Sequence, residues 1–253
     1  MSINSTLVIQ SHCEPLPFPW LHTCINTVKQ WAKQYQYEYL FIGDELFEFV
    51  SPELLEKVKP QKVIATDLAR LIAINKHLDH YETVIWCDSD FLIFDAESFL
   101  LPNESYVLGR EVWIQEDNHQ LKSYIKVHNA FMMFRRGNSF LKFYIETAEK
   151  LLTLNTGTMP PQFIGPKLIT ALSNIAQCPI METAGMLSPL VVKDIAKKSG
   201  AALNLFINKS PQPISAANLC TSLCQSGEIT EKEIDICIEV LLNDKSILTS
   251  ESK

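Results

Sequence analysis

The sequence predicts an α/β domain whose central sheet is mixed, mostly parallel and flanked by helices. β-prone runs alternate with amphipathic helical patterns through the first hundred residues, which is the arrangement of parallel strands joined by helical connections. The run TVIWC at 83–87 is continuously apolar and of strand length, so it suits a central strand covered on both faces. In such Rossmann-like sheets, ligands bind at the carboxyl ends of the strands.

The first elements are predicted from apolar spacing and from proline. A β-prone run at 6–10 ends in a loop, because prolines 15, 17 and 19 exclude a helix there. From Leu21 onward, apolar side chains recur every three or four residues, as on one face of an amphipathic helix. The further elements expected before residue 83 are a strand at 37–42, a short helix opening at Pro52 and a longer helix at about 67–78.

Helix-capping residues predict where two helices begin in the second half of the chain. Ser188 followed by Pro189 suits a cap with proline at the first helical position, and Thr230 with Glu233 forms a capping box. The elements expected before them are strands at 106–109 and 127–134, a helix at 139–152 and a loop at 155–161.

Size and composition indicate a single domain over residues 1–253, with 176–253 as a C-terminal helical elaboration. A chain of 253 residues, 47% of them hydrophobic, can bury a large core. Its seven cysteines show no spacing typical of a metal site, so we expect free thiols.

The charge pattern restricts the partners and the compartment. A net charge of -7 without any block of Lys and Arg argues against nucleic acid or an anionic membrane as the main partner. No leader-like segment opens the chain, and no apolar run approaches the roughly 20 residues that span a bilayer. We therefore expect a cytoplasmic protein without a transmembrane segment, while peripheral membrane association and the oligomeric state stay open.

Two carboxylates bracketed by apolar runs are the most informative feature. Asp88 and Asp90 stand in IWCDSDFLIF, at the end of the buried strand expected at 83–87. A desolvated carboxylate without a partner is costly and tends to take up a proton. A hard divalent cation such as Mg²⁺ or Mn²⁺ neutralises such a pair and bridges to the oxygens of a diphosphate. The sequence thus predicts Asp88 and Asp90 as metal ligands.

An acidic and a basic residue precede this pair. Asp67 and Arg70 are one helical turn apart near the start of the helix expected at 67–78, so their side chains share a face. A carboxylate accepts from sugar hydroxyls, and a guanidinium donates to hydroxyl or phosphate oxygens. The simpler interpretation is a polar turn at 88–90 and a surface ion pair worth at most about 1 kcal/mol. The apolar flanks of the turn and the upstream TDLAR favour the functional interpretation.

With these elements the chain resembles the GT-A glycosyltransferases that carry a DxD motif, in the style of the family 32 capsular-polysaccharide enzymes and mannosyltransferases. The resemblance covers about residues 5–175 and rests on Asp67 with Arg70, the DSD turn at 88–90, HNAF at 128–131 and Gly165-Pro166. Where that family has two glycines before the metal strand, this chain has DHYE at 79–82, which is closer to family 8.

The resemblance implies a hexosyltransferase of polysaccharide biosynthesis. It would move a sugar from a UDP- or GDP-sugar to a hydroxyl acceptor on a saccharide, glycolipid or protein, with retention of anomeric configuration. Asp90 would bind Mn²⁺ or Mg²⁺ directly, Asp88 would contact the metal or the ribose, and Asp67 with Arg70 would hold the donor sugar. The further donor contacts it implies are Gln10, Ser11, His12, Ser89 and Asn129, and the acceptor side would use Gln162, Gly165 and Pro166. Trp20 is a candidate for stacking on the base and residues 109–113 are candidates for reaching the acceptor, with packing in the core as the alternative for Trp20 and Trp113.

Two roles and two rival functions stay open. A late metal ligand is often a histidine in GT-A enzymes, but none follows His128. The alternative ligands are Asn208, Asn218 and Ser222, and the bases that inversion would need are Glu111, Asp117 or Glu182. One rival function is a catalytically silent sugar-nucleotide or glycan-binding module on the same fold. The other is a haloacid-dehalogenase-type phosphatase, whose aspartates normally precede Gly-Thr or Thr-Leu near the N-terminus.

Overall fold

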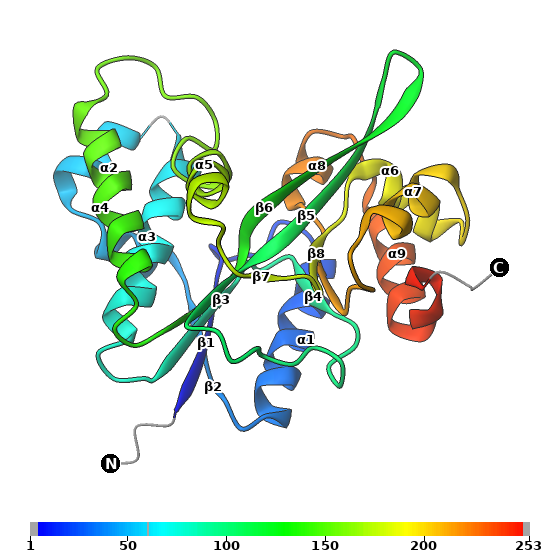
Figure 1. Ribbon diagram of the computed structural model, residues 1–253, viewed down its shortest axis with the longest axis horizontal. Coiled ribbons are helices and arrows are strands. Elements are labelled where there is room, and N and C mark those ends of the chain that lie inside the picture. The colour runs from blue at the N-terminus through cyan, green and yellow to red at the C-terminus, as the bar shows by residue number, and fades with distance from the viewer. Residues whose placement is uncertain (1–4, 60, 250–253) are drawn as a thin grey trace.

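A six-stranded mixed sheet forms the centre of the computed structural model, which describes residues 5–59 and 61–249 (Figure 1). The strand order is β2 (Glu38–Ile42), β1 (Thr6–Ser11), β3 (Thr83–Cys87), β6 (Gln120–Arg135), β5 (Tyr106–Asp117) and β7 (Ile180–Met181). β6 runs antiparallel to β3 and β5, and the other neighbouring pairs of this sheet are parallel. The predicted α/β class with a mixed, mostly parallel central sheet flanked by helices is confirmed.

Helices cover both faces of this sheet. Successive side chains of a strand point to opposite faces, and both faces of the central strands carry apolar side chains that pack against helices. The helices of this part of the chain are α1 (Trp20–Gln34), η1 (Asp44–Phe49), α2 (Pro52–Val58), α3 (Lys62–His77), α4 (Ser139–Leu154) and α5 (Pro166–Ala176). Leu7 and Val84 pack on one face of the sheet, with residues of α3, α4 and α5. Val8 and Ile85 pack on the other face, with residues of α1.

A second, three-stranded sheet joins the aspartate turn to the C-terminal part. β4 (Phe91–Ile93), which starts directly after Asp90, pairs antiparallel with β9 (Ala216–Asn218), and β9 pairs parallel with β8 (Ala184–Met186). The surrounding helices are α6 (Pro189–Ala196), α7 (Ala201–Lys209), α8 (Thr221–Gln225), α9 (Glu231–Asn243) and η2 (Lys245–Leu248). The predicted elaboration at 176–253 therefore contains strands as well as helices. Residues 1–4 and 250–253 of the predicted domain lie outside the described residues.

α3 is longer than the sequence predicted. It begins at Lys62 because Ile64 and Ala65 already contribute to the buried face. Asp67 and Arg70 consequently lie in the middle of the helix, and the expectation that they stand near its start is wrong. From this position Arg70 bonds Asp88, which follows β3, and lies 3.4 Å from Asp67.

β5 and β6 extend well beyond the strands predicted at 106–109 and 127–134. They form a long hairpin that projects away from the rest of the sheet (Figure 1). Asn118 and His119 at its tip have φ of 51° and 59°, as a two-residue type I′ turn requires. Polar residues on one face concealed the extra length, while Val112 and Ile114 alternate with them and are buried in the C-terminal cluster.

The capping signals had different outcomes. The box at Thr230 is confirmed, since Thr230 and Glu233 bond reciprocally at the start of α9. Ser188 does occupy the cap before Pro189, but its buried hydroxyl makes no hydrogen bond to any described residue. The seven cysteines, each in the described part of the chain, are free as expected. No helix in residues 5–59 and 61–249 has the length and apolar character needed to cross a bilayer.

Candidate active site

A cleft of about 870 Å³ lies at the carboxyl end of β3, where a parallel sheet usually binds its ligand. Side chains from α3, the turn after β3, the β5–β6 hairpin, α5 and the segment around α8 line it. The lining residues used below are Asp67, Arg70, Asp88, Asp90, Glu111, Trp113, Gln115, Tyr124, Lys126, Asn129, Gln162, Pro166, Asn218, Thr221 and Ser222.

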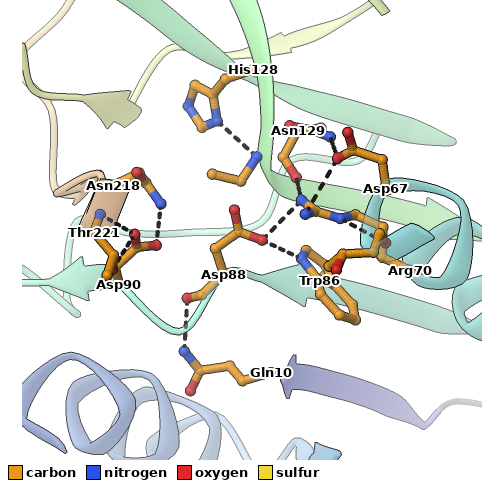
Figure 2. A network of polar contacts seen from close by, with 12 residues as sticks. Gln10, Asp67, Arg70, Trp86, Asp88, Asp90, His128, Asn129, Asn218 and Thr221 are labelled. Carbon is orange, nitrogen blue, oxygen red and sulfur yellow. Dashed lines mark hydrogen bonds and ion pairs between the residues drawn. The ribbon is translucent and has the colours of Figure 1, made fainter. Parts of the chain in front are cut away.

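Asp88 uses one carboxylate oxygen within the protein and leaves the other free (Figure 2). Its Oδ1 accepts hydrogen bonds from Arg70 Nη1 at 2.9 Å and from Trp86 Nε1 at 2.7 Å. Gln10 Nε2 donates to the backbone oxygen of Asp88 at 3.0 Å, which ties the turn to β1. No described residue donates to Oδ2, and the side chain is 26% exposed. This oxygen is therefore available to a ligand.

Arg70 is a buried cation held between two carboxylates. Its Nη2 lies 3.4 Å from Asp67 Oδ1, and its Nη1 donates to Asp88. The guanidinium carbon lies 5.3 Å from the centre of the Trp86 ring. Burial alone would lower the pKa of Arg70, but Asp88 and Asp67 outweigh burial and raise the pKa. Arg70 thus stays charged. It neutralises part of the negative charge of the aspartates, which the sequence analysis expected a metal ion to neutralise.

Asp67 keeps one buried oxygen without a partner. Oδ1 accepts a hydrogen bond from Asn129 Nδ2 at 2.9 Å, whereas Oδ2 has no donor among the described residues. Burial raises the pKa of Asp67 to about 6, although Arg70 and Asn129 oppose the rise. A Cβ at Gly165 would lie 2.3 Å from Oδ2, so the predicted Gly165 is the residue that leaves room for this carboxylate.

A bulge in β6 aims Asn129 at Asp67. A register shift just before Gly109 leaves residues 129–131 without partners on β5. Two backbone carbonyls of this segment are used by the site. Asn129 O accepts from Arg70 Nη1 at 3.1 Å, and Ala130 O accepts from the backbone nitrogen of Asp88 at 2.8 Å. Residues 129 and 130 therefore connect Arg70 of α3 to the aspartate turn.

His128 supports this bulge and stays neutral. Its Nε2 donates to the backbone oxygen of Ala184 at 3.1 Å, and its Nδ1 accepts from the backbone nitrogen of Ala130 at 3.2 Å. Burial lowers the pKa of His128 to about 4. The ring fills the space beside Gly109, where a Cβ would lie 2.1 Å from it. With both ring nitrogens occupied, His128 has a structural role.

Asp90 is bound on both oxygens by the C-terminal segment (Figure 2). Oδ1 accepts from Asn218 Nδ2 at 2.5 Å. Oδ2 accepts from the backbone nitrogen of Thr221 at 2.7 Å and from its hydroxyl at 2.8 Å. Burial and the charge of Asp88 raise the pKa of Asp90, and the donors from Thr221 and Asn218 oppose the rise.

The two aspartates suit a hard divalent cation but form an incomplete site by themselves. Within residues 5–59 and 61–249, no three side chains of His, Cys, Asp or Glu come together to hold an ion. Mg²⁺ is commonly held by one or two carboxylates together with substrate phosphates. The free Oδ2 of Asp88 and the remaining lone pairs of Asp90 fit a cation that shares its shell with a diphosphate. Asn218 Oδ1 accepts from the backbone nitrogen of Cys220 at 2.9 Å and is turned away from Asp90.

Some predicted contacts do not reach this cleft. Gln10 is fully buried, and its amide bonds the backbone of Asp88 and accepts from the hydroxyl of Tyr39, so its predicted contact with the donor is wrong. The other predicted residues that do not line the cleft are Ser11, His12, Ser89, Gly165 and Asn208. On the predicted acceptor side, the residues that line it are Glu111, Trp113, Gln162 and Pro166. Of the late ligand candidates, Asn218 and Ser222 line it.

Only one of the candidates for base stacking and for a catalytic base lines the cleft, considering Trp20, Glu111, Asp117 and Glu182. Trp20 is 3% exposed and packs in the C-terminal cluster, which is the core position left open for it and not a base-stacking position. Of the candidate bases, Glu182 is paired with Arg110, and Asp117 bonds Lys122 near the hairpin tip. Glu111 alone of the three lines the cleft.

Sequence reasoning missed Thr221, Tyr124 and Lys126. Thr221 reaches Asp90 across 131 residues of sequence, and no local signal marks such a contact. The other two had a signal, since period-two alternation along the hairpin places them opposite Trp113 and Glu111 on one face. That signal required the strand to be recognised beyond its predicted end.

Solved structures that resemble this chain include glycosyltransferases. One, involved in the glycosylation of the major capsid of PBCV-1, is 11% identical, with a TM-score of 0.47 over 92% of this chain and 99% of that one. The galactosyltransferase LgtC, in complex with donor and acceptor sugar analogs, is 10% identical, with a TM-score of 0.45 over 92% and 95%. An active-site mutant of LgtC is 11% identical, with a TM-score of 0.42 over 85% and 87%. No protein-family model and no curated protein matches the chain. With TM-scores this low, the similarities carry no inference about the reaction.

Proposed function

We propose that this chain is a metal-dependent glycosyltransferase of the GT-A type that moves a hexose from a nucleotide-diphosphate sugar to a hydroxyl acceptor. The observation that carries the proposal is the convergence of Asp67, Arg70, Asp88, Asp90 and Asn129 in one cleft at the end of β3. These residues come from α3, β6 and the turn after β3, and hydrogen bonds and ion pairs link four of them directly.

The donor sugar would lie against Asp67 and Asn129. Asp67 Oδ2 is a buried acceptor without a partner, which costs about 1–3 kcal/mol until a donor reaches it. A sugar hydroxyl is such a donor, and a small movement of the side chain would bring the two together. Arg70 would hold Asp88 in place and supply positive charge beside the diphosphate.

Asp88 and Asp90 would hold Mn²⁺ or Mg²⁺ together with the diphosphate. A cation there offsets the charge that develops on the departing nucleoside diphosphate. Asp88 Oδ2 would be the principal protein ligand, because three donors already occupy Asp90. We expect retention of configuration, with the departing phosphate accepting the proton of the acceptor hydroxyl. Inversion would use Glu111, the candidate base that lines the cleft.

A panel of UDP- and GDP-sugars tests this proposal. Thermal stabilisation and donor hydrolysis would be measured with Mn²⁺ and with EDTA. We expect one donor to stabilise the wild-type protein and to be hydrolysed only with the metal. Asp88→Asn should abolish both effects, and Glu97→Gln, an exposed carboxylate outside the cleft, should abolish neither. Release of phosphate from a phosphomonoester, without any response to nucleotide sugars, would favour the phosphatase rival and overturn the proposal.

The hydrogen bonding of Asp90 favours one second candidate, a silent sugar-nucleotide or glycan-binding module. Both oxygens of Asp90 are occupied by Asn218 and Thr221, as in a carboxylate that serves only the fold. Such a module would bind a nucleotide sugar tightly, with or without the metal, and release no product. Turnover measured at saturating donor therefore separates the two functions.

A further inference from the structure

The exposed face of the β5–β6 hairpin carries two aromatic and three polar side chains toward the cleft. Trp113 is directly opposite Tyr124, and Glu111 is directly opposite Lys126. Gln115 continues the same face, because positions two apart on a strand point the same way. All five residues line the cleft, although none of them touches the aspartate turn through a hydrogen bond in the described structure.

The other face of the hairpin is built to keep this surface in place. Val112 and Ile114, which alternate with Glu111, Trp113 and Gln115 on β5, are buried in the C-terminal cluster. Trp113 is half-buried against the same cluster and still reaches the cleft. The Trp113 side chain is thus held by a packed backing, so a ligand that stacks on it would lose little to the ordering of this side chain.

The polar members of the face have unused hydrogen-bonding capacity. Glu111 is half-buried and accepts no hydrogen bond from any described residue. Burial raises the pKa of Glu111, and Lys126 opposes the rise. Gln115 and Lys126 are exposed at the mouth of the cleft. Aromatic rings beside a free carboxylate, an amide and an ammonium match a saccharide, which offers apolar C–H faces and a rim of hydroxyls.

We propose that the hairpin face Glu111, Trp113, Gln115, Tyr124 and Lys126 is the acceptor subsite and that the acceptor is a saccharide whose ring stacks on Trp113 and Tyr124. This assignment rests on the proposed transferase function. The face forms one wall of the cleft, and the groups proposed to bind the donor line the same cleft. Glu111 binds an acceptor hydroxyl, and Trp113 with Tyr124 sets which ring fits. A glycolipid or a protein acceptor would need its own sugar residue at this wall.

Kinetics with split readouts test the subsite. Trp113→Ala should raise the acceptor KM at least about 10-fold, the effect of removing a stacked aromatic anchor. Donor hydrolysis without acceptor should stay at the wild-type rate in Ile125→Ala. In Trp113→Ala it should fall by a smaller factor than the acceptor KM rises, because the proposed donor contacts are on other elements. Tyr124→Ala and Glu111→Gln should raise the acceptor KM by smaller factors. The matched control is Ile125→Ala, since Ile125 is 51% exposed on the same hairpin and does not line the cleft.

Direct binding separates failure of the subsite from failure of the transferase proposal. Wild-type protein would be applied to a printed array of mono- to tetrasaccharides, with Trp113→Ala and Ile125→Ala beside it. Saccharide binding lost only in Trp113→Ala supports the subsite even if no nucleotide sugar is turned over. Donor turnover without saccharide binding leaves the transferase proposal standing and overturns the subsite. Weaker nucleotide binding by Trp113→Ala, with an unchanged acceptor KM, would also overturn the subsite, since it would show that a base stacks there.

Discussion

Asp88 and Asp90 are separated by one residue, yet they belong to two different regions of the molecule. Asp88 faces the N-terminal region, where Arg70 and Trp86 hold one of its oxygens and leave the other open. Asp90 faces the C-terminal region, where Asn218 and Thr221 occupy both oxygens. One short turn therefore carries a carboxylate that can bind a ligand and a carboxylate that fastens the chain.

The difference shows that the spacing of a motif does not assign its roles. From the sequence, Asp90 was predicted to bind the metal directly, and Asp88 was predicted to contact either the metal or the ribose. The hydrogen bonds favour Asp88 as the principal ligand, because its Oδ2 is free. They also show that Asp90 has a structural role, since it joins the aspartate turn to Asn218 and Thr221 of the C-terminal region. Substitutions that remove charge at one position or the other can separate the two duties.

The largest effect is expected for Asp88→Asn. Transfer or donor hydrolysis supported by Mn²⁺ should fall at least roughly 100-fold, because the open ligand oxygen of the site is replaced. Stability should change little, since the Asn oxygen can still accept from Arg70 and Trp86, and Arg70 keeps Asp67 as its ion-pair partner. Kinetics and thermal unfolding of the same preparation measure both. A large loss of stability would show that Asp88 also fastens the fold.

Asp90→Asn should differ by destabilising the protein. An amide offers one acceptor oxygen where the carboxylate offers two, so one donor from Asn218 or Thr221 loses its partner. We expect the free energy of unfolding to fall by about 1–3 kcal/mol. Urea denaturation measures it, with Asp88→Asn as the reference. Equal stability of the two variants would remove the contrast between the two regions.

Thr221→Val isolates a single bond of this contact. The hydroxyl donor to Asp90 is lost while the backbone donor stays, so a decrease of about 1 kcal/mol in stability is expected. Ser222→Ala, a neighbouring hydroxyl that makes no hydrogen bond to Asp90, is the control. The affinity for Mn²⁺ without donor should rise slightly in Thr221→Val, because a lone pair of Asp90 becomes free. Isothermal titration would contradict this if the affinity fell.

The smallest effect is a pH dependence of protein stability caused by Asp67, which belongs to the same region as Asp88. Since the pKa of Asp67 is raised to about 6, its charged form is disfavoured in the folded state, and wild-type stability is lost as pH rises from the unfolded value near 3.8 through 6. Asp67→Asn removes this loss and should be the more stable protein at pH 7.5, while using the donor sugar poorly. The difference should vanish toward pH 4. His128, whose pKa is lowered to about 4, destabilises both proteins alike as pH falls below 6.5, so its contribution cancels.

The sequence was sufficient for the features that depend on local patterns. The strand at 83–87, the helix from about residue 21 and the Thr230 capping box follow from apolar period and capping chemistry. Asp67, Arg70, Asp88 and Asn129 line one cleft, and their roles in binding stay predictions.

The rest depended on contacts that no local pattern encodes. Gln10 looks like a ligand residue at a strand end, and only the fold shows that its amide is consumed by the backbone of Asp88. Thr221 reaches Asp90 from a distant part of the chain, through the pairing of β4 with β9. The strands predicted at 106–109 and 127–134 were too short, because the polar face of the hairpin obscured the alternation of apolar residues. The residues proposed for the acceptor therefore lay outside the predicted strands.

The pairing of β4 with β9 sets an order of events during synthesis. Asp90 leaves the ribosome long before Thr221 does, since 131 positions separate them. Until that segment emerges, the nascent chain exposes an unpaired strand edge and a carboxylate without its donors, and contacts so distant in sequence form slowly. The aspartate turn therefore gains the hydrogen bonds of Asp90 only when the C-terminal segment arrives, so we expect a chain terminated before Thr221 to be prone to self-association.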